Sequence, residues 1–144
     1  MSFQFPTDYK FVLASLALIP AFSTYLGITV IKARKTGKVE LPLLFASEAD
    51  AAADPAKYKF NCTQKSAMNF QEHMPGFVVG ALISGVSFPR ATAIAVLSWL
   101  SGRYLYHQGY SSGDPKKRSR GFHGSLTHLV VTLGALYSAY CLIF

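Results

Sequence analysis

The stretch FVLASLALIPAFSTYLGITVI, residues 11–31, contains no charged residue and decides the fold class. As a helix it is long enough to cross the hydrocarbon core of a bilayer, which takes about 20 mostly apolar residues. It is longer than the apolar part of a secretory signal and ends in the basic run 32–38, so we interpret it as a retained span. A second uncharged stretch, GFHGSLTHLVVTLGALYSAYCLIF at 121–144, predicts another span.

The composition agrees with a membrane protein. Of the 144 residues, 51% are apolar and only 15% are charged, against about 25% charged in average globular proteins. Too few charges remain to cover a water-facing surface, and so apolar a chain is not disordered. The length fits one domain. Cys62 and Cys141 lie far apart, which disfavours a disulfide scaffold and a structural zinc site.

Two further uncharged segments, 74–89 and 91–102, lie between these spans and extend past a few polar residues to full length. The sequence therefore predicts an all-α integral membrane domain of four transmembrane helices that occupies residues 1–144. The expected helices cover about 8–33, 62–87, 91–111 and 119–143. A polar connector at about 34–60 holds a short helix in ASEADAAADPAK.

Basic residues are distributed unevenly between the two sides of this arrangement. Ten of the 14 Lys and Arg residues lie in or beside the first and third connections, and only Lys10 and Arg90 lie on the opposite side. The positive-inside rule therefore places these two connections in the cytosol. The same rule accounts for the basic run KKRSR at 116–120, so we expect no nucleic-acid partner.

Polar side chains recur at helical spacing inside the second and third spans. Lys65, Asn69 and Glu72 share one helical face, and a second face carries Arg103, Tyr106 and Tyr110. Ionisable groups in a bilayer usually face the bundle interior and mark function. Basic residues at the cytosolic helix ends add to this polar chamber, namely Arg34 and either Arg118 or Arg120.

Two interpretations of this chamber stay open at this point. Lys65, Glu72 and Arg103 could form a structural ion-pair network between helices. Alternatively, the cations in excess of the one carboxylate bind a small anionic ligand, which the whole constellation favours. The four histidines form no H-E-x-x-H motif and no pairing with carboxylates, so no metal site is predicted.

Two segments resemble the MAPEG family, the membrane-associated proteins of eicosanoid and glutathione metabolism. They are FNCTQKSAMNFQEHMPGF (60–77) and GRYLYHQGYSSGDPKKRSRG (102–121), and KARKTGKVELP (32–42) extends the resemblance. Within the family, the type-3 microsomal glutathione transferase branch looks most similar. The resemblance implies a four-helix protomer, a homotrimer in the endoplasmic reticulum membrane, and glutathione as co-substrate between neighbouring subunits, on the cytosolic side.

The resemblance also implies roles for individual residues. The glutathione-binding set would be Arg34, Lys65, Asn69, Glu72, Arg103, Tyr106, Gln108 and Tyr110. The thiol-activating arginine of the leukotriene-synthase branch falls, at the same offset, on Lys117. It falls on Arg118 if the loop holds one extra residue, and we favour Arg118, with Lys117, Arg120 and Tyr110 as alternatives. Lys65 stands where arginine is common in the family, and His73 where several members have tyrosine.

The implied activity is that of a glutathione transferase or glutathione-dependent peroxidase, acting on lipophilic electrophiles or lipid hydroperoxides that arrive from the bilayer. Activity like that of leukotriene C synthase belongs to the same set. The alternative is a non-catalytic lipid-binding or scaffold protein of the same fold, since the family contains such a member, which lacks the glutathione-site residues. A further hypothesis is that Cys141 is a lipid-modified cysteine. The residues do not identify the electrophile.

Overall fold

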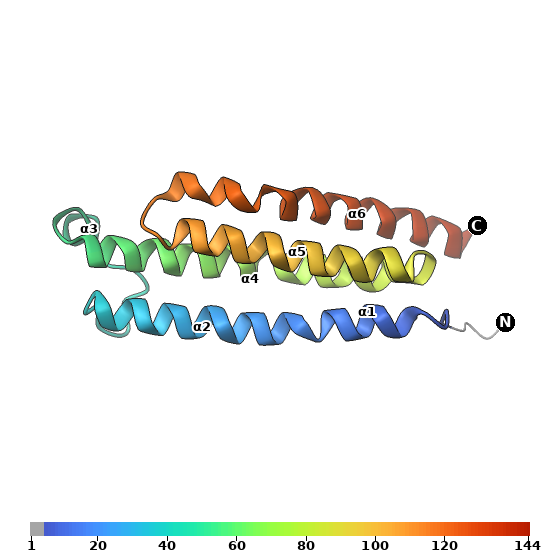
Figure 1. Cartoon of the computed structure of the whole chain (residues 1–144), viewed down its shortest axis with the longest axis horizontal. Coiled ribbons are helices and arrows are strands. Elements are labelled where there is room, and N and C mark those ends of the chain that lie inside the picture. The colour runs from blue at the N-terminus through green and yellow to red at the C-terminus, as the bar shows by residue number, and fades with distance from the viewer. Residues whose placement is uncertain (1–4) are drawn as a thin grey trace.

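A computed structural model describes residues 5–144, and this part of the chain is helical without any strand. The elements are α1 (Tyr9–Leu16), α2 (Leu18–Thr36), α3 (Glu48–Ala53), α4 (Pro55–Ser87), α5 (Pro89–Tyr110), the 3₁₀ helix η1 (Pro115–Gly121) and α6 (Phe122–Ile143). Figure 1 shows an elongated bundle in which α1 and α2 follow each other along one rod, with α4, α5 and α6 roughly alongside. The start of α1 and the end of α6 lie at one end, and α3 lies at the other.

Within the described residues, two segments are long and apolar enough to cross a membrane, Tyr9–Thr36 and Pro115–Ile143. Only 11% of the most apolar window of the second segment is buried within the protein. The outer face of α6 instead exposes large aliphatic side chains, including Leu129, Val130, Leu133 and Leu136. An exposed apolar band of this kind is unusual on a soluble monomer and suits contact with lipid.

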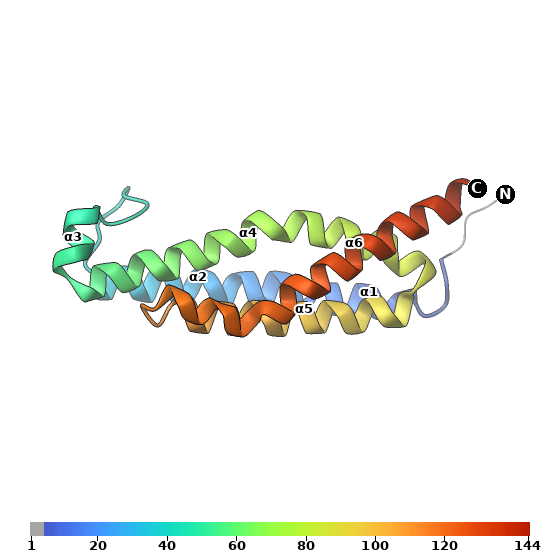
Figure 2. The same cartoon turned by 90° about the horizontal axis from the view of Figure 1, so that it is seen from above.

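The first predicted span is a single rod interrupted at Ala17, where α1 ends and α2 begins. Pro20 explains this break. Proline has no N–H to donate to the carbonyl of Leu16, and its ring crowds that carbonyl. Pro75 removes a bond from α4 in the same way, and α4 curves along its length in Figure 2.

The connector between the first two spans is shorter than expected. The short helix expected in ASEADAAADPAK is present as α3, with the Ser47 hydroxyl accepting the N–H of Asp50 at 3.1 Å. The next helix does not begin at about residue 62, however, but at Pro55, because the Asp54 side chain accepts the N–H of Ala56 at 2.8 Å and caps it there. Asn61, in the second turn of α4, exchanges two hydrogen bonds with the backbone of Ala46.

Aromatic rings form the centre of the bundle. Trp99 of α5 stacks on Phe77 of α4 with ring centroids 3.9 Å apart, and Phe70 lies 5.4 Å from the same indole. Phe22 of α2 meets Phe70 edge to face at 5.1 Å. These rings join α2, α4 and α5 just beside Arg103, so they fix the framework on which the polar chamber is built.

Glycines let α5 approach the segment that follows it. A Cβ atom on Gly102 would lie 2.5 Å from the Cα of Gly124, and one on Gly109 would collide with the backbone carbonyl of Lys117. Small residues of this kind allow close contact between membrane helices. The contact holds η1, and with it Arg118, against α5.

We expect alanine at Gly102 to destabilise the protein, whereas alanine at Gly27 does not. Overpacking against the Gly124 backbone should cost about 1–3 kcal/mol. A Cβ on Gly27 meets nothing within 4 Å, so that substitution should be neutral or should stabilise α2 by up to about 1 kcal/mol. The free energy of unfolding in detergent measures both. Equal stability of the two variants would contradict the close α5–α6 packing.

Candidate functional site

A buried guanidinium forms the centre of the polar chamber. Arg103 of α5 is 7% exposed and donates from Nη1 and Nη2 to the side-chain and backbone oxygens of Asn69 on α4, both at 3.1 Å. Its guanidinium carbon also lies 5.6 Å from the Trp99 ring and 5.5 Å from the Tyr106 ring. Within residues 5–144, Nε has no hydrogen-bond partner and no carboxylate forms a salt bridge with this arginine.

One carboxylate lies close by, on the same face of α4 as Asn69. Glu72 is 3.5 Å from the Lys65 ammonium and accepts a 3.4 Å hydrogen bond from the Asn69 amide. The Lys65 and Glu72 side chains are 48% and 51% exposed. Both contacts are long, so they can open at small cost when a ligand offers a better partner.

Two phenols and one further arginine extend the chamber toward η1. The rings of Tyr106 and Tyr110 are 5.8 Å apart on one face of α5. Tyr106 and Arg118 together line a cavity of about 450 Å³ between α5, η1 and the start of α6.

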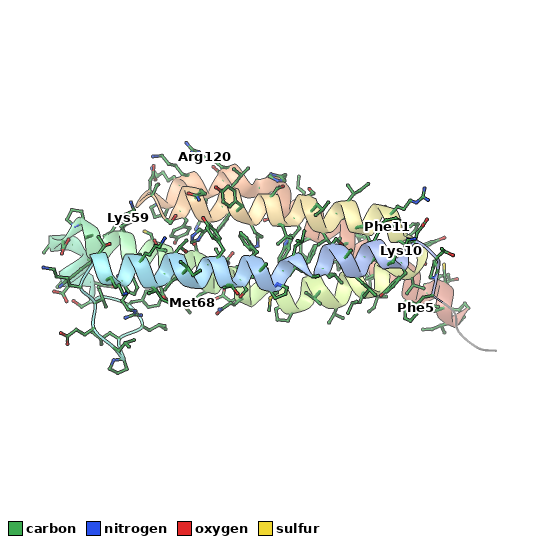
Figure 3. All side chains as sticks on the ribbon, turned by 60° about the horizontal axis from the view of Figure 1, so that its bottom comes forward. Phe5, Lys10, Phe11, Lys59, Met68 and Arg120 are labelled. Atoms are coloured by element: carbon green, nitrogen blue, oxygen red, sulfur yellow. The ribbon has the colours of Figure 1, made fainter. Side chains whose placement is uncertain are left out.

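The other basic residues of this loop are arranged differently. Lys117 forms an ion pair with Asp114 at 3.8 Å. Arg120 does not line the cavity, and Figure 3 shows it at the outer edge of the bundle, toward the end that also carries Lys59. Lys10 lies at the opposite end in that view. Lys116 lines the cavity as well, and among the candidates expected from the sequence for the activating position, which are Arg118, Lys117, Arg120 and Tyr110, Arg118 is the one that does so.

Two residues of the expected set do not join the chamber within one protomer. Arg34 donates to the Leu43 carbonyl at 2.7 Å and lies over the Phe60 ring at 4.6 Å, so it holds its own connector in place. Gln108 donates to the Tyr25 hydroxyl at 2.9 Å and lines a separate cavity between α2, α4 and α5. It projects from a different face of α5 than Tyr106 and Tyr110, two positions away from each.

The structure adds a histidine pair to the chamber that was not among the expected site residues. His73 of α4 and His128 of α6 have ring centroids 5.8 Å apart and line a cavity of about 260 Å³ together with Arg103. The sequence carried one signal for it, because Ser125, His128 and Thr132 follow each other at steps of 3 and 4 and share a face of α6. Among the described residues, no three His, Cys, Asp or Glu side chains form a metal-binding group.

The model of the MAPEG family matches residues 12–138. That range covers most of the chain and contains every residue of the polar chamber described above.

Stability separates the two interpretations of the chamber. Asn69→Ala should destabilise the protein by about 1.5–3 kcal/mol, because the buried Arg103 cation loses a charge-assisted acceptor. Glu72→Gln should change the free energy of unfolding by less than about 1 kcal/mol, because a half-exposed ion pair contributes little. Chemical unfolding in detergent without added ligand compares the two. If Glu72→Gln is as destabilising as Asn69→Ala, the carboxylate belongs to a structural ion-pair network.

Proposed function

The chain belongs to the MAPEG family, and we propose that it is a membrane-bound glutathione transferase or glutathione-dependent peroxidase. Family membership supports a membrane function in glutathione or eicosanoid metabolism in general. The more specific activity, and similarity to the type-3 microsomal branch, are part of the proposal.

One observation carries the proposal: within residues 5–144, the buried Arg103 forms no salt bridge with a carboxylate and lies beside a half-exposed carboxylate and a lysine. Glutathione has two carboxylates and one ammonium, so its charges complement this arrangement. Arg103 and Lys65 would bind carboxylates, and Glu72 would bind the γ-glutamyl ammonium through a charge-assisted hydrogen bond. Within residues 5–144 the Nε of Arg103 has no hydrogen-bond partner and is a further donor, and Arg103 also lines the cavity between His73 and His128.

The proposal includes a membrane arrangement. The rod α1–α2 and the helices α4, α5 and α6 would be the four spans of one domain, and the end that carries α3 and η1 would face the cytosol. The protein would be a homotrimer in the endoplasmic reticulum membrane. In that assembly Arg34 and Gln108 would reach glutathione only from a neighbouring subunit, since each is engaged elsewhere in its own protomer.

The proposed chemistry begins with the glutathione thiol, whose ordinary pKa is near 8.5, so only a small fraction is thiolate at neutral pH. The Arg118 guanidinium beside the thiol would stabilise the anion and lower that pKa. The thiolate sulfur then forms a bond to an electrophilic carbon, and the leaving group or the conjugated system takes the electron pair. With a hydroperoxide, the sulfur attacks the terminal oxygen and the O–O bond breaks, which leaves glutathione sulfenic acid and an alkoxide that takes a proton and is released as the alcohol. A second glutathione thiol then reduces the sulfenic acid, giving glutathione disulfide and water. No covalent intermediate on the protein is required.

The alternative is a lipid-binding or scaffold protein of the same fold. The chamber distinguishes the two, because a scaffold gains nothing from a buried cation that lacks a carboxylate partner. The presence of Asn69, Glu72, Arg103, Tyr106 and Tyr110 in contact with one another favours the enzyme.

Glu72→Gln should weaken glutathione binding about ten- to hundredfold, because the ligand ammonium loses a charge-assisted partner worth about 1.5–3 kcal/mol. Isothermal titration of the detergent-purified protein measures the change in Kd. Glu48→Gln is the matched control, since it removes the same charge from α3, far from the chamber. Unchanged binding by Glu72→Gln would remove this carboxylate from the site.

Arg118→Ala should leave glutathione affinity within a few-fold, because the carboxylate-binding residues remain. It should raise the pKa of the bound thiol, which abolishes thiolate absorbance in the ultraviolet at pH 7 and moves the pH–rate profile alkaline. Arg120→Ala, one exposed arginine further along η1, is the control and should keep the signal of the unaltered protein. If both variants keep it, another group such as Lys117 or Tyr110 activates the thiol.

A further inference from the structure

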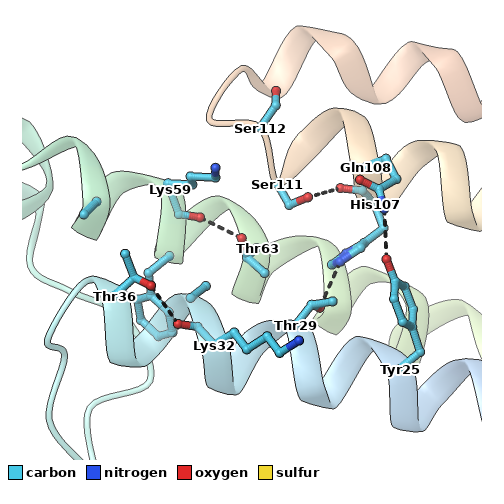
Figure 4. A pocket seen from close by; sticks show the side chains of 13 residues that line it. Tyr25, Thr29, Lys32, Thr36, Lys59, Thr63, His107, Gln108, Ser111 and Ser112 are labelled. Carbon is cyan, nitrogen blue, oxygen red and sulfur yellow. Dashed lines mark hydrogen bonds between the residues drawn. The ribbon is translucent and has the colours of Figure 1, made fainter.

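A second polar cavity lies apart from the chamber around Arg103. It has a volume of about 520 Å³ and opens between α2, α4 and α5, near the end of the bundle that carries α3. Figure 4 shows Lys32 entering it from α2 and Lys59 from α4, with His107 and Gln108 on the α5 side. Of the residues assigned to glutathione above, only Gln108 lines this cavity.

The cavity carries positive charge without a counter-charge. No Asp or Glu lines it, and within residues 5–144 neither Lys32 nor Lys59 forms a salt bridge. His107 of α5 lines the cavity and forms hydrogen bonds with Thr29 of α2, at 2.9 Å, and with Ser66 of α4. The three helices around the cavity are therefore linked to one another. Two ammonium groups on linked helices, one on α2 and one on α4, suit an anionic ligand that spans the distance between them.

The hydroxyl groups that line the cavity place a second requirement on its ligand. Thr36, Thr63, Ser111 and Ser112 each donate their proton to a backbone carbonyl of their own helix or turn, at 2.6–3.0 Å. Their oxygens therefore keep lone pairs but have no proton left for a ligand. At these four hydroxyl oxygens the cavity can therefore only accept hydrogen bonds from a ligand. The two lysines can donate them, and so can the Tyr25 hydroxyl, which accepts its own bond from Gln108.

This pattern selects among anionic ligands. An occupant needs an anionic group for the lysines and neutral donors, such as hydroxyls, for the threonine and serine oxygens. An ammonium would find no carboxylate in the lining, and a quaternary amine has no proton to donate. A phosphate ester of a polyhydroxyl compound meets both requirements.

We propose that this cavity binds a polyol phosphate ester and that its occupant is the headgroup of an inositol phospholipid of the cytosolic leaflet. The lipid assignment rests on the membrane orientation proposed above, which puts Lys32 and Lys59 at the level of the headgroups. Basic pockets between membrane helices on the cytosolic side bind such headgroups. By joining α2 to α4, the headgroup would stabilise the bundle without touching the thiol chemistry.

Native mass spectrometry of the full-length, detergent-purified protein tests this, with phosphatidylinositol, phosphatidylserine and phosphatidylcholine as separate probes. Phosphatidylinositol should bind most tightly. The double variant Lys32→Gln/Lys59→Gln should bind it roughly 10- to 30-fold more weakly, since each lysine near the headgroup contributes about one kcal/mol. Lys35→Gln/Lys57→Gln is the matched control, with the same charge change on the same two helices outside the cavity, and should bind normally.

Further measurements distinguish a lipid headgroup from a soluble ester and test the site itself. If soluble inositol 1-phosphate binds as tightly as the lipid and with the same dependence on Lys32 and Lys59, the occupant is a soluble ester and the lipid assignment is wrong. Equal binding of all three lipids, or equal loss in the two double variants, would overturn the site itself. Glutathione titration of Lys32→Gln/Lys59→Gln should be unchanged, so failure of this proposal is distinguishable from failure of the proposed function.

Discussion

The burial of the Arg103 guanidinium is the constraint on which the rest of the site depends. A cation enclosed by Trp99, Tyr106 and the α4 backbone loses its hydration, which costs several kcal/mol unless partners replace the water. Within residues 5–144 its hydrogen-bond partners are neutral, the two oxygens of Asn69, and it forms no salt bridge. These oxygens fix α5 against α4 at one level. An anionic ligand would complete the arrangement, and Glu72, half exposed one turn away, limits which anion fits.

The two arginines of the proposed mechanism lie in different environments, which suits the different roles proposed for them. Arg103 is buried and held by two hydrogen bonds to Asn69, as suits the proposed binding role. Arg118 is exposed on η1 and makes no ion pair within the described part of the chain, so its guanidinium is available to a thiol. Its position depends on backbone contact between α5 and η1, where Gly109 leaves no room for a side chain. The close backbone packing at Gly109 therefore determines where Arg118 lies, and with it the geometry of the step proposed for this arginine.

Helical periodicity explains why much of the chamber could be predicted from the sequence. Residues at steps of 3 and 4 share a face, so the stripes at Lys65, Asn69, Glu72 and at Arg103, Tyr106, Tyr110 could be recognised, and the structure brings them into contact. This periodicity does not predict which faces of different helices pack against one another. The location of Gln108 on another face, the internal contacts of Arg34 and the approach of His128 to His73 therefore emerged only in three dimensions. The early start of α4 did have a local signal, the Asp54-Pro55 cap, whereas the expected boundary followed hydropathy alone.

The most direct test titrates the unaltered, detergent-purified protein with glutathione and with the analogue that lacks the γ-glutamyl amino group, both at pH 7. If the chamber recognises glutathione by its charged groups, the titration should show measurable heat of glutathione binding. The analogue, which offers Glu72 no ammonium, should bind at least tenfold more weakly, since the carboxylate then faces no positive partner on the ligand. Absence of glutathione binding, or equal affinity for the two ligands, would contradict the account.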